Sequence, residues 1–315
     1  VQYIIHHAEA GVVLVENAAQ FAKIAQERHR LPQLRHVVLM QGASVDDPLA
    51  LSWDQFLARG DATPDSAVDD RVRNIPEDAT ATYIYTSGTT GPPKAVMLSH
   101  LNVLWTADSV TAMMKFTPDD SMLSYLPLSH IAEQLISLYG PVILGNQVYF
   151  AESLEKVPEN LKEVQPTIFF GVPRIWEKFH AAVRGKLGQV TGTKKLLINW
   201  AMGVARRVHA LGNRSAPIPA LLGLQYALAQ RLVFRKLKTA LGLGRVKICS
   251  SGAAPIAGEV LEFFSGLDLV VHEVYGQSED TGPTTTNFPG NTRFGTVGKP
   301  IPGVEVRIAA DGEIL

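Results

Sequence analysis

Short runs of β-branched and apolar residues alternate with longer amphipathic segments along most of the 315-residue chain. In segment 17–28, apolar residues such as Phe21 and Ile24 recur at helical spacing and predict a helix. A second helix is predicted to begin after Ser99, which is suited to cap it, and to end near Met114. The short apolar runs predict strands at residues 12–15, 36–40, 81–85, 121–126, 167–170, 246–250 and 269–274. Alternation of strands and helices predicts an α/β fold with doubly wound, mainly parallel sheets.

Two stretches depart from this alternation. Residues 60–78 are rich in Asp and Pro and predict a surface connection. After about Thr284 the helical pattern ends, and residues 294–308 combine Gly and Pro with alternating Val and Ile. This change predicts the start of a small antiparallel β subdomain at 284–315, after a larger region at 1–283.

Composition narrows the class of protein. Hydrophobic residues make up 46% of the chain and charged residues 19%, a balance typical of a globular protein with a sizeable core. A formal net charge of -1 gives no reason to expect nucleic acid as a partner. No apolar run reaches the ~18 residues that a membrane-spanning helix needs. Cys249 is the single cysteine, which excludes an internal disulfide and favours a reducing, cytoplasmic location.

Charge is distributed unevenly along the chain. Between Glu177 and Glu259 there is no Asp or Glu, whereas Lys and Arg recur throughout residues 178–247. Two interpretations remain open for this basic segment. It forms a solvated helical face balanced by acidic residues elsewhere, or it forms a surface for anionic lipid headgroups or for the phosphates of a cofactor.

The strongest chemical signal is residues 83–94, with the sequence YIYTSGTTGPPK. A predicted strand enters a loop with two glycines and four hydroxyl side chains, and Lys94 closes it. Glycines allow backbone N–H groups to turn toward an anion, while the hydroxyls and the lysine add donors and charge. No Gly-Lys-Ser/Thr sequence opens a helix here, so the loop is not a Walker A motif; residues 95–98 look like a strand. The segment predicts a polyphosphate cradle.

This loop resembles the phosphate loop of the adenylate-forming superfamily, although Ala95 stands where that superfamily most often has glycine. Further motifs follow at the expected spacings: LPLSH at 126–130, GVPRIW at 171–176, SGAAP at 251–255, YGQSE at 275–279 and GTVGKP at 295–300. The likeness spans nearly the whole chain and is greatest to the bubblegum-type long-chain fatty acyl-CoA synthetases. It implies that 1–283 is an incomplete N-terminal adenylation domain and that the C-terminal domain, which follows Leu315 in the family, is absent.

The resemblance implies a reaction in two steps. A long-chain fatty acid attacks the α-phosphate of ATP to give acyl-AMP and pyrophosphate, and coenzyme A then displaces AMP to give acyl-CoA. The family uses Mg²⁺, for which Glu279 and Thr86 supply oxygen ligands. The implied residues are catalytic Lys94, Glu279 and His130; nucleotide-binding Thr86, Ser87, Gly88, Thr89, Thr90, Gly91, Lys94, Gly252, Ala253, Ala254, Tyr275, Gly276 and Ser278; acyl-binding His130, Gly171, Val172, Trp176, Gly252 and Ala253; and metal-binding Thr86 and Glu279.

Two other functions are considered. Adenylation of an aryl or amino acid is the nearest enzymatic alternative, but peptide synthetases hold the substrate ammonium with an aspartate in the segment that corresponds to 126–134, and none occurs there. A non-catalytic nucleotide- or lipid-binding homologue is the second alternative, and the presence of Thr86, Lys94 and Glu279 argues against it. We expect a cytoplasmic enzyme that contacts anionic membranes peripherally through 178–247.

Overall fold

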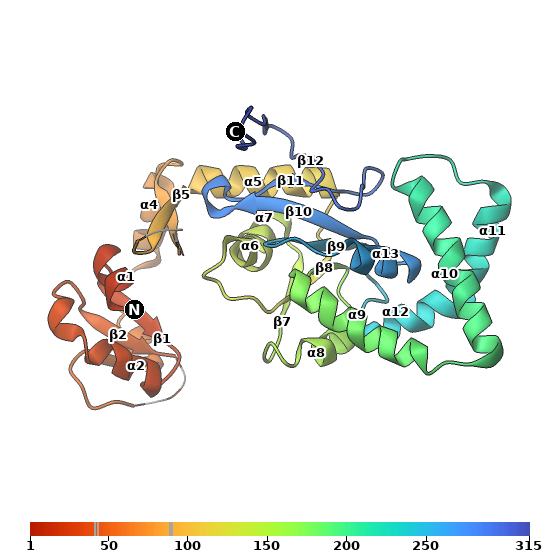
Figure 1. The fold of residues 1–315 in the computed structure, drawn as a ribbon. Helices are drawn as coiled ribbons and strands as arrows, with labels where there is room; N and C mark the ends of the chain where they lie inside the picture. The colour runs from red at the N-terminus through yellow and green to blue at the C-terminus, as the bar shows by residue number, and fades with distance from the viewer. Residues whose placement is uncertain (41, 43, 88–90) are drawn as a thin grey trace. The chain divides into compact units, whose positions relative to one another are not determined.

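The computed structural model describes residues 1–40, 42, 44–87 and 91–315, drawn as a ribbon in Figure 1. The chain divides into two compact units, Val1–Ser99 and His100–Leu315. Every strand predicted from the sequence is present, with ends that differ by no more than a few residues. No helix in the described parts of the chain is both long and apolar enough to cross a membrane.

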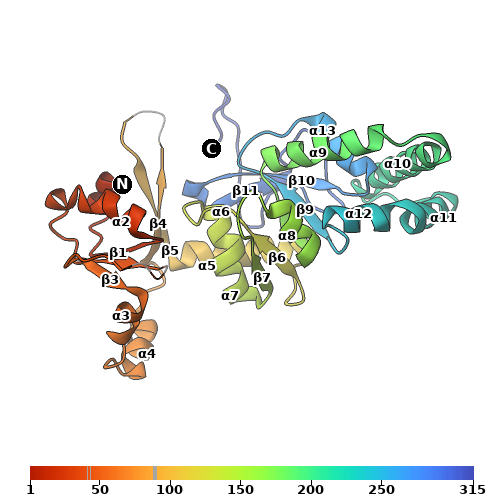
Figure 2. The same ribbon diagram turned by 90° about the horizontal axis from the view of Figure 1, so that it is seen from below.

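The first unit contains a small parallel sheet with the strand order β1-β2-β3, seen with its helices in Figure 2. Asn17 caps α2 by accepting a hydrogen bond from the Gln20 N–H, and Phe21 and Ile24 on the same helix are buried, as their spacing predicts. An antiparallel hairpin, β4-β5, follows the sheet. The elements are α1 (Gln2–His7), β1 (Val12–Val15), α2 (Ala18–Ala25), the 3₁₀ helix η1 (Arg28–Arg30), β2 (His36–Leu39), β3 (Ala50–Ser52), α3 (Trp53–Ala58), α4 (Asp65–Asn74), β4 (Thr80–Thr86) and β5 (Lys94–Ser99).

Segment 60–78 lies on the surface, as the sequence predicts, but it also contains a helix that the sequence analysis does not predict. This ten-residue helix, α4, has no buried residue. Pro64 precedes the helix in an extended conformation, Asp65 lies in its first turn, and Arg73 in its last turn pairs with Asp69 and Asp70. Acidic residues at the start and basic residues at the end suit the helix dipole. Apolar periodicity cannot reveal a helix that buries nothing.

The second unit is built on a seven-stranded sheet with the order β12-β11-β10-β9-β8-β6-β7. Pairing is parallel from β10 to β7 and antiparallel between β10, β11 and β12, so the expected mainly parallel sheet is confirmed. The strands are β6 (Ser121–Ser124), β7 (Gln147–Phe150), β8 (Ile168–Phe170), β9 (Ile248–Ser251), β10 (Val271–Gln277), β11 (Gly282–Thr286) and β12 (Lys299–Pro300).

Helices of the second unit pack around this sheet, and α10 and α11 lie together at the end opposite α6 and α7 in both ribbon views (Figures 1 and 2). The predicted helix after Ser99 is confirmed as α5. The helices are α5 (His100–Met114), α6 (Ile131–Gln134), the π-helix η2 (Leu135–Tyr139), α7 (Gly140–Leu144), α8 (Val157–Val164), α9 (Pro173–Gly188), α10 (Gly192–Gly212), α11 (Ala220–Ala229), the π-helix η3 (Gln230–Phe234), α12 (Arg235–Leu241), α13 (Gly258–Gly266) and the 3₁₀ helix η4 (Ser278–Asp280).

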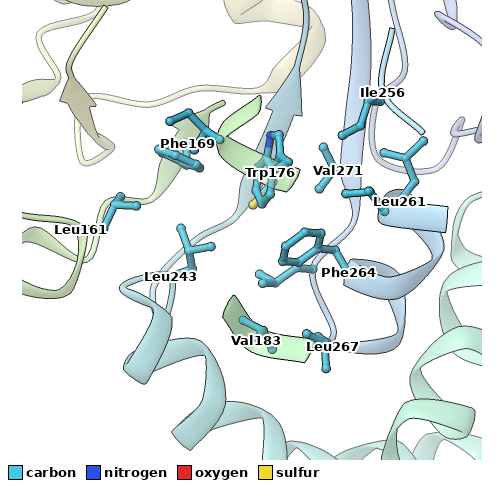
Figure 3. Packing of buried hydrophobic residues seen from close by; sticks show 14 of the residues in the cluster. Leu161, Phe169, Trp176, Val183, Leu243, Ile256, Leu261, Phe264, Leu267 and Val271 are labelled. Carbon is cyan, nitrogen blue, oxygen red and sulfur yellow. The ribbon is translucent and has the colours of Figure 1, made fainter. Parts of the chain in front are cut away.

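The main core lies where α9 and α13 meet strands β8 to β10. Trp176 is fully buried there, with its ring 5.4 Å from Phe169 and 5.0 Å from Phe264 between ring centres (Figure 3). Its indole Nε1 donates a hydrogen bond of 3.1 Å to the Ser250 carbonyl on β9, so the one polar atom of the side chain is satisfied. Aromatic burial on this scale makes the cluster a principal source of the unit's stability.

The end of the chain joins the main sheet. β12 pairs antiparallel with β11. Between these two strands an isolated bridge joins Phe288 to Asn291, and beyond β12 another isolated bridge joins Ile308 to Ile314. The antiparallel pairing expected after Thr284 is therefore present. Its assignment to a subdomain of its own stays a prediction.

Candidate functional site

The predicted phosphate loop joins β4 to β5 in the first unit. Thr86 and Lys94 form the last paired position of the hairpin, so both flank the opening of the loop. Within the loop Ser87 is exposed, and Gly91 has a φ of 86°, a left-handed conformation that suits glycine. Gly88, Thr89 and Thr90 lie outside the described residues. The hairpin thus brings a hydroxyl and an ammonium group together at the base of a glycine-containing turn, as a polyphosphate site requires.

Helix α1 contacts strand β4 of this hairpin and the loop residue that precedes β5. The Tyr3 hydroxyl donates a hydrogen bond of 3.0 Å to the Pro93 carbonyl, and Nδ1 of His7 lies 2.8 Å from the Tyr85 hydroxyl. Tyr3 and His7 are four residues apart, hence on one face of the helix, and their rings stack at 5.4 Å. Each residue they contact directly precedes a predicted phosphate or metal ligand. No sequence pattern predicts this support, because it depends on a contact between segments that are far apart in the chain.

The second unit contains a cavity of about 660 Å³, within the usual size range of small-molecule sites. Its walls come from helices α5 and η2, from the segment that precedes α6, and from residues at the ends of strands β8, β9 and β10. Ligands of open α/β sheets bind at the carboxyl ends of strands, which is the position of this cavity. The structure therefore brings together these sequence-predicted residues: His130, Val172, Gly252, Ala253, Gly276 and Ser278.

The turn after β9 brings the backbone close to the neighbouring strands. A Cβ at position 252 would lie 3.1 Å from the Val274 carbonyl oxygen and 3.3 Å from the Phe170 ring, so Gly252 leaves little room for a side chain. Ala253 has a φ of 70°, which is uncommon for a residue with a Cβ. Strained backbone of this kind is concentrated at ligand sites, where the surrounding structure holds it in place. Ala254, the next predicted residue, is exposed and does not line the cavity.

A bulge interrupts the pairing of β10 with β11 between Tyr275 and Gly276. A Cβ at position 276 would lie 1.7 Å from the Gly282 carbonyl oxygen, so only glycine fits there. Bulges bend a strand and redirect its side chains, and they are frequent beside active sites. Here the bulge leads directly into η4, which carries Ser278 on the cavity wall and the exposed Glu279. Tyr275 is half-buried and lies next to the cavity lining rather than in it.

Two residues that the resemblance assigns to the acyl site, Trp176 and Gly171, do not line this cavity. Trp176 is buried in the core, and the acyl-binding assignment of both residues stays a prediction. A Cβ at position 171 would lie 2.7 Å from Nε1 of that indole, so Gly171 makes room for the buried ring. Val172, between them in the motif, does reach the cavity. The motif therefore combines a packing function with one wall residue.

Sequence reasoning missed the helical wall of the cavity. Thr106, Ala107, Val110 and Met114 of α5 line it, at the 3–4-residue spacing of one helix face. The helix predicted after Ser99 has an apolar face that could have indicated this wall. From sequence alone, however, such a face cannot be distinguished from one that packs in the core. No Asp, Glu, Lys or Arg belongs to the described lining, in which His130 is the one imidazole side chain. Such walls suit the apolar part of a ligand.

A buried carboxylate follows the cavity-lining residue Ala132 in the chain. Glu133 is 2% exposed, and it accepts hydrogen bonds of 2.5 Å from the Ser124 hydroxyl and 2.6 Å from the Ser137 hydroxyl. It belongs to the segment where an amino-acid-activating enzyme would hold an ammonium group. Because both serines donate to the carboxylate and it is absent from the cavity lining, Glu133 serves packing in this structure.

The predicted metal ligands, Thr86 and Glu279, belong to different units, and the structure describes each in its own unit. Across the described residues there is no cluster of three or more His, Cys, Asp or Glu side chains that could hold a metal by itself. The hydroxyl of Thr86 and the carboxylate of Glu279 are oxygen donors of the kind that Mg²⁺ prefers. Protein sites usually bind Mg²⁺ through one or two such side-chain oxygens together with substrate phosphates and waters.

Comparison with known proteins agrees with these features. The sequence model of the family described as "AMP-binding enzyme" matches residues 1–314. The chain is 38% identical over 327 residues to the long-chain-fatty-acid–CoA ligase ACSBG2 of Xenopus laevis, covering 99% of this chain and 44% of that protein. It is also 38% identical over 310 residues to human ACSBG2 and 34% identical over 315 residues to ACSBG1 of Bos taurus, covering 46% and 43% of those proteins. The chain thus spans somewhat less than half of these relatives.

Solved structures show the same fold. The anthranilate CoA ligase AuaEII in complex with anthranoyl-AMP superposes with a TM-score of 0.63 at 18% identity, covering 100% of this chain and 50% of that one. Apo MatB from Rhodopseudomonas palustris superposes with a TM-score of 0.61 at 22% identity and the same coverage of both chains. The sequence match over nearly all residues is the stronger finding, and by it the chain belongs to the AMP-binding enzyme family.

Proposed function

We propose that this chain is the nucleotide- and acyl-binding part of a long-chain fatty acid–CoA ligase. The observation that carries the proposal is the cavity, whose described walls hold no Asp, Glu, Lys or Arg and which reaches the glycine turns after β9 and β10. An apolar acyl chain is stabilised there by about 0.8 kcal/mol for each buried methylene. The long-chain ligases similar over nearly the whole chain support the same substrate class.

The proposed reaction requires no nucleophile from the protein. The fatty carboxylate attacks the α-phosphate of ATP, pyrophosphate leaves, and the coenzyme A thiol then displaces AMP from the acyl-adenylate. Two anions must approach each other in the first step, so the chain has to position them and offset their charge. Lys94 and the loop amides serve the phosphates, and His130 lies in the cavity wall, where it could contact the carboxylate. Mg²⁺ held by Glu279 and Thr86 would neutralise phosphate charge.

Pyrophosphate exchange tests the first step. Full-length protein should incorporate labelled pyrophosphate into ATP only when a long-chain fatty acid is present. Glu279→Ala should lower the exchange rate more than tenfold, because losing a contact made in the transition state costs about 2 kcal/mol or more. Glu262→Ala, on the exposed side of α13, is the matched control and should leave the rate unchanged. Exchange driven by an amino or aryl acid instead would favour the alternative substrates, and no exchange at all would favour a non-catalytic homologue.

Lys94→Ala tests the phosphate loop separately. Removing this ammonium group should raise the KM for ATP, with less effect on the KM for the fatty acid, because the group faces the β- and γ-phosphates in this proposal. Lys23→Ala on α2 removes the same charge elsewhere in the first unit. Unchanged ATP affinity together with an unchanged exchange rate would reduce Lys94 to a surface charge.

We further propose that the protein works in the cytoplasm in peripheral contact with anionic membranes through residues 178–247. Long fatty acids partition into membranes, and this segment contains many Lys and Arg residues but no Asp or Glu. Each basic residue near an anionic surface contributes about 1 kcal/mol, and the attraction is screened by salt. Binding to anionic but not to neutral vesicles, weakening as salt rises, is the expected result.

A further inference from the structure

Helix α11 exposes an apolar face. Its ten residues include no charged side chain, and Leu221, Leu224 and Leu228 are 70%, 71% and 50% exposed. Leu232, one turn further along in η3, is also exposed. These leucines are spaced by three or four residues, so they form one stripe along the helix. Single exposed leucines are ordinary, but a continuous stripe on an uncharged helix indicates a surface that contacts an apolar partner.

Basic side chains continue this stripe. α11, η3 and α12 follow one another without a break, and Arg231 and Arg235 lie on the same side as the leucines by helical spacing. Both arginines and Lys236 are exposed, and none takes part in a salt bridge found among the described residues. The Nη2 atom of Arg207 on α10 lies 3.3 Å from Oε1 of Gln225, which places another cation beside α11.

The opposite face of the same helices is anchored to Asp268, in the connection between α13 and β10. Tyr226, Gln230 and Lys238 lie at four- and eight-residue intervals, and all three donate hydrogen bonds to the buried carboxylate of Asp268. Nε2 of His209 on α10 lies 2.9 Å from the same carboxylate. Since the helix cannot rotate without breaking these contacts, the leucine stripe is held facing outward. We call Tyr226, Gln230, Lys238, His209 and Asp268 the Asp268 cluster.

We infer that the leucine stripe of α11 inserts into the interfacial layer of an anionic membrane, with Arg231, Arg235 and Lys236 on the lipid phosphates. An apolar face bordered by Lys and Arg is the composition of helices that lie in a membrane interface. Charge complementarity selects the occupant, because no acidic residue between Glu177 and Glu259 would repel an anionic surface. The inference rests on the proposed function and deepens it, since it names the inserting side chains.

Vesicle binding by the full-length protein tests this inference. The probes are phosphatidylcholine vesicles with and without phosphatidylserine, assayed by co-sedimentation at rising salt. The double variant Leu221→Ser/Leu224→Ser should weaken binding to the anionic vesicles by about tenfold or more, because it removes apolar area that enters the interface. Arg231→Gln/Arg235→Gln should also weaken binding and should flatten its salt dependence. Leu57→Ser, at an exposed leucine of α3, is the matched control and should bind like wild type.

Three results would overturn the inference. Unchanged vesicle binding by the double serine variant would show that α11 does not insert. A marked loss of thermal stability in that variant would show that another part of the protein covers the stripe. Conversion of an oligomer to a monomer by the same substitutions would assign the stripe to a second copy of the chain. Ligase activity on detergent-dispersed fatty acid separates this inference from the proposed function. The double serine variant should keep that activity. A wild-type protein that lacks the activity would refute the ligase function and leave the membrane inference standing.

Discussion

Two apolar helix faces in the second unit differ in what lies opposite them. On α5, Thr106, Ala107 and Val110 turn toward the cavity, where β8, β10 and η2 supply the other walls. On α11, Leu221 and Leu224 turn away from the sheet and meet solvent. Both helices have apolar faces at helical spacing, yet one encloses a space for a ligand and the other forms part of the surface.

The difference lies in side-chain size and in anchoring. Small residues such as Ala107 and Gly252 keep the cavity open, because larger side chains would fill it. α11 has leucines on its outer face and hydrogen-bonding groups on its inner face, of which Tyr226 contacts the buried Asp268. A buried carboxylate with several donors holds a helix in one orientation more specifically than apolar packing does. The outward orientation of the leucines is therefore built into the structure and does not reflect loose packing.

The largest effect is expected from breaking the Asp268 cluster. Asp268→Ala should destabilise the second unit by about 3–5 kcal/mol, because it leaves Lys238 buried without its partner. α10 to α12 should loosen first, whereas ATP and fatty acid should still bind at low temperature. Denaturant unfolding followed by tryptophan fluorescence measures the stability, with Asp311→Ala at an exposed position as the control. A change below about 1 kcal/mol would mean that the cluster does not anchor these helices.

The same substitution at two leucines compares a buried face with an exposed one. Leu261→Ala in α13 removes a fully buried side chain and should cost about 2–5 kcal/mol of unfolding free energy. Leu224→Ala on α11 should change it by less than about 0.5 kcal/mol, since that side chain meets solvent. Equal costs at the two positions would show that the stripe is covered in the full-length protein.

Filling the cavity should separate long from short acids. Ala107→Phe places an aromatic ring in the space that about four methylenes of the substrate would occupy, so kcat/KM for palmitate should fall roughly 200-fold, or about 3 kcal/mol. Activity on a short acid should be retained. Ala112→Phe, on the exposed side of α5, is the matched control. A thermal unfolding scan checks that overpacking has not simply destabilised the protein. Equal losses for short and long acids would contradict the placement of the acyl chain.

The smallest expected effect is the pH dependence of the anchoring. Burial by itself would raise the pKa of Asp268, but hydrogen bonding from His209 and the charge of Lys238 outweigh it and lower the pKa to about 2. A lowered pKa stabilises the fold above the unfolded value of about 3.9, and this contribution of about 2–3 kcal/mol is lost as pH falls from about 4 toward about 2. Unfolding free energies measured across this range should fall less steeply in Asp268→Asn than in wild type. Parallel curves would contradict the prediction.

Much of the site followed from the sequence because its motifs are local. The hairpin around Thr86 and Lys94 and the turns at Gly252 and Gly276 depend on a few consecutive residues with special backbone requirements. Trp176 did not follow, because an aromatic residue in a binding motif can face either a ligand or the core. Its hydrogen bond to Ser250, far away in the sequence, decides for the core.

By itself, the sequence determined seven of the strands, the alternation of strands with helices, the phosphate-loop hairpin and the family, since each depends on local periodicity or on short motifs. Only the tertiary structure decided that α5 forms the wall of the cavity and that the leucines of α11 face outward. Apolar residues at helical spacing show which face of a helix avoids water, but they do not show what covers that face. That choice depends on contacts between segments far apart in sequence, such as those of Asp268 with Tyr226 and Lys238.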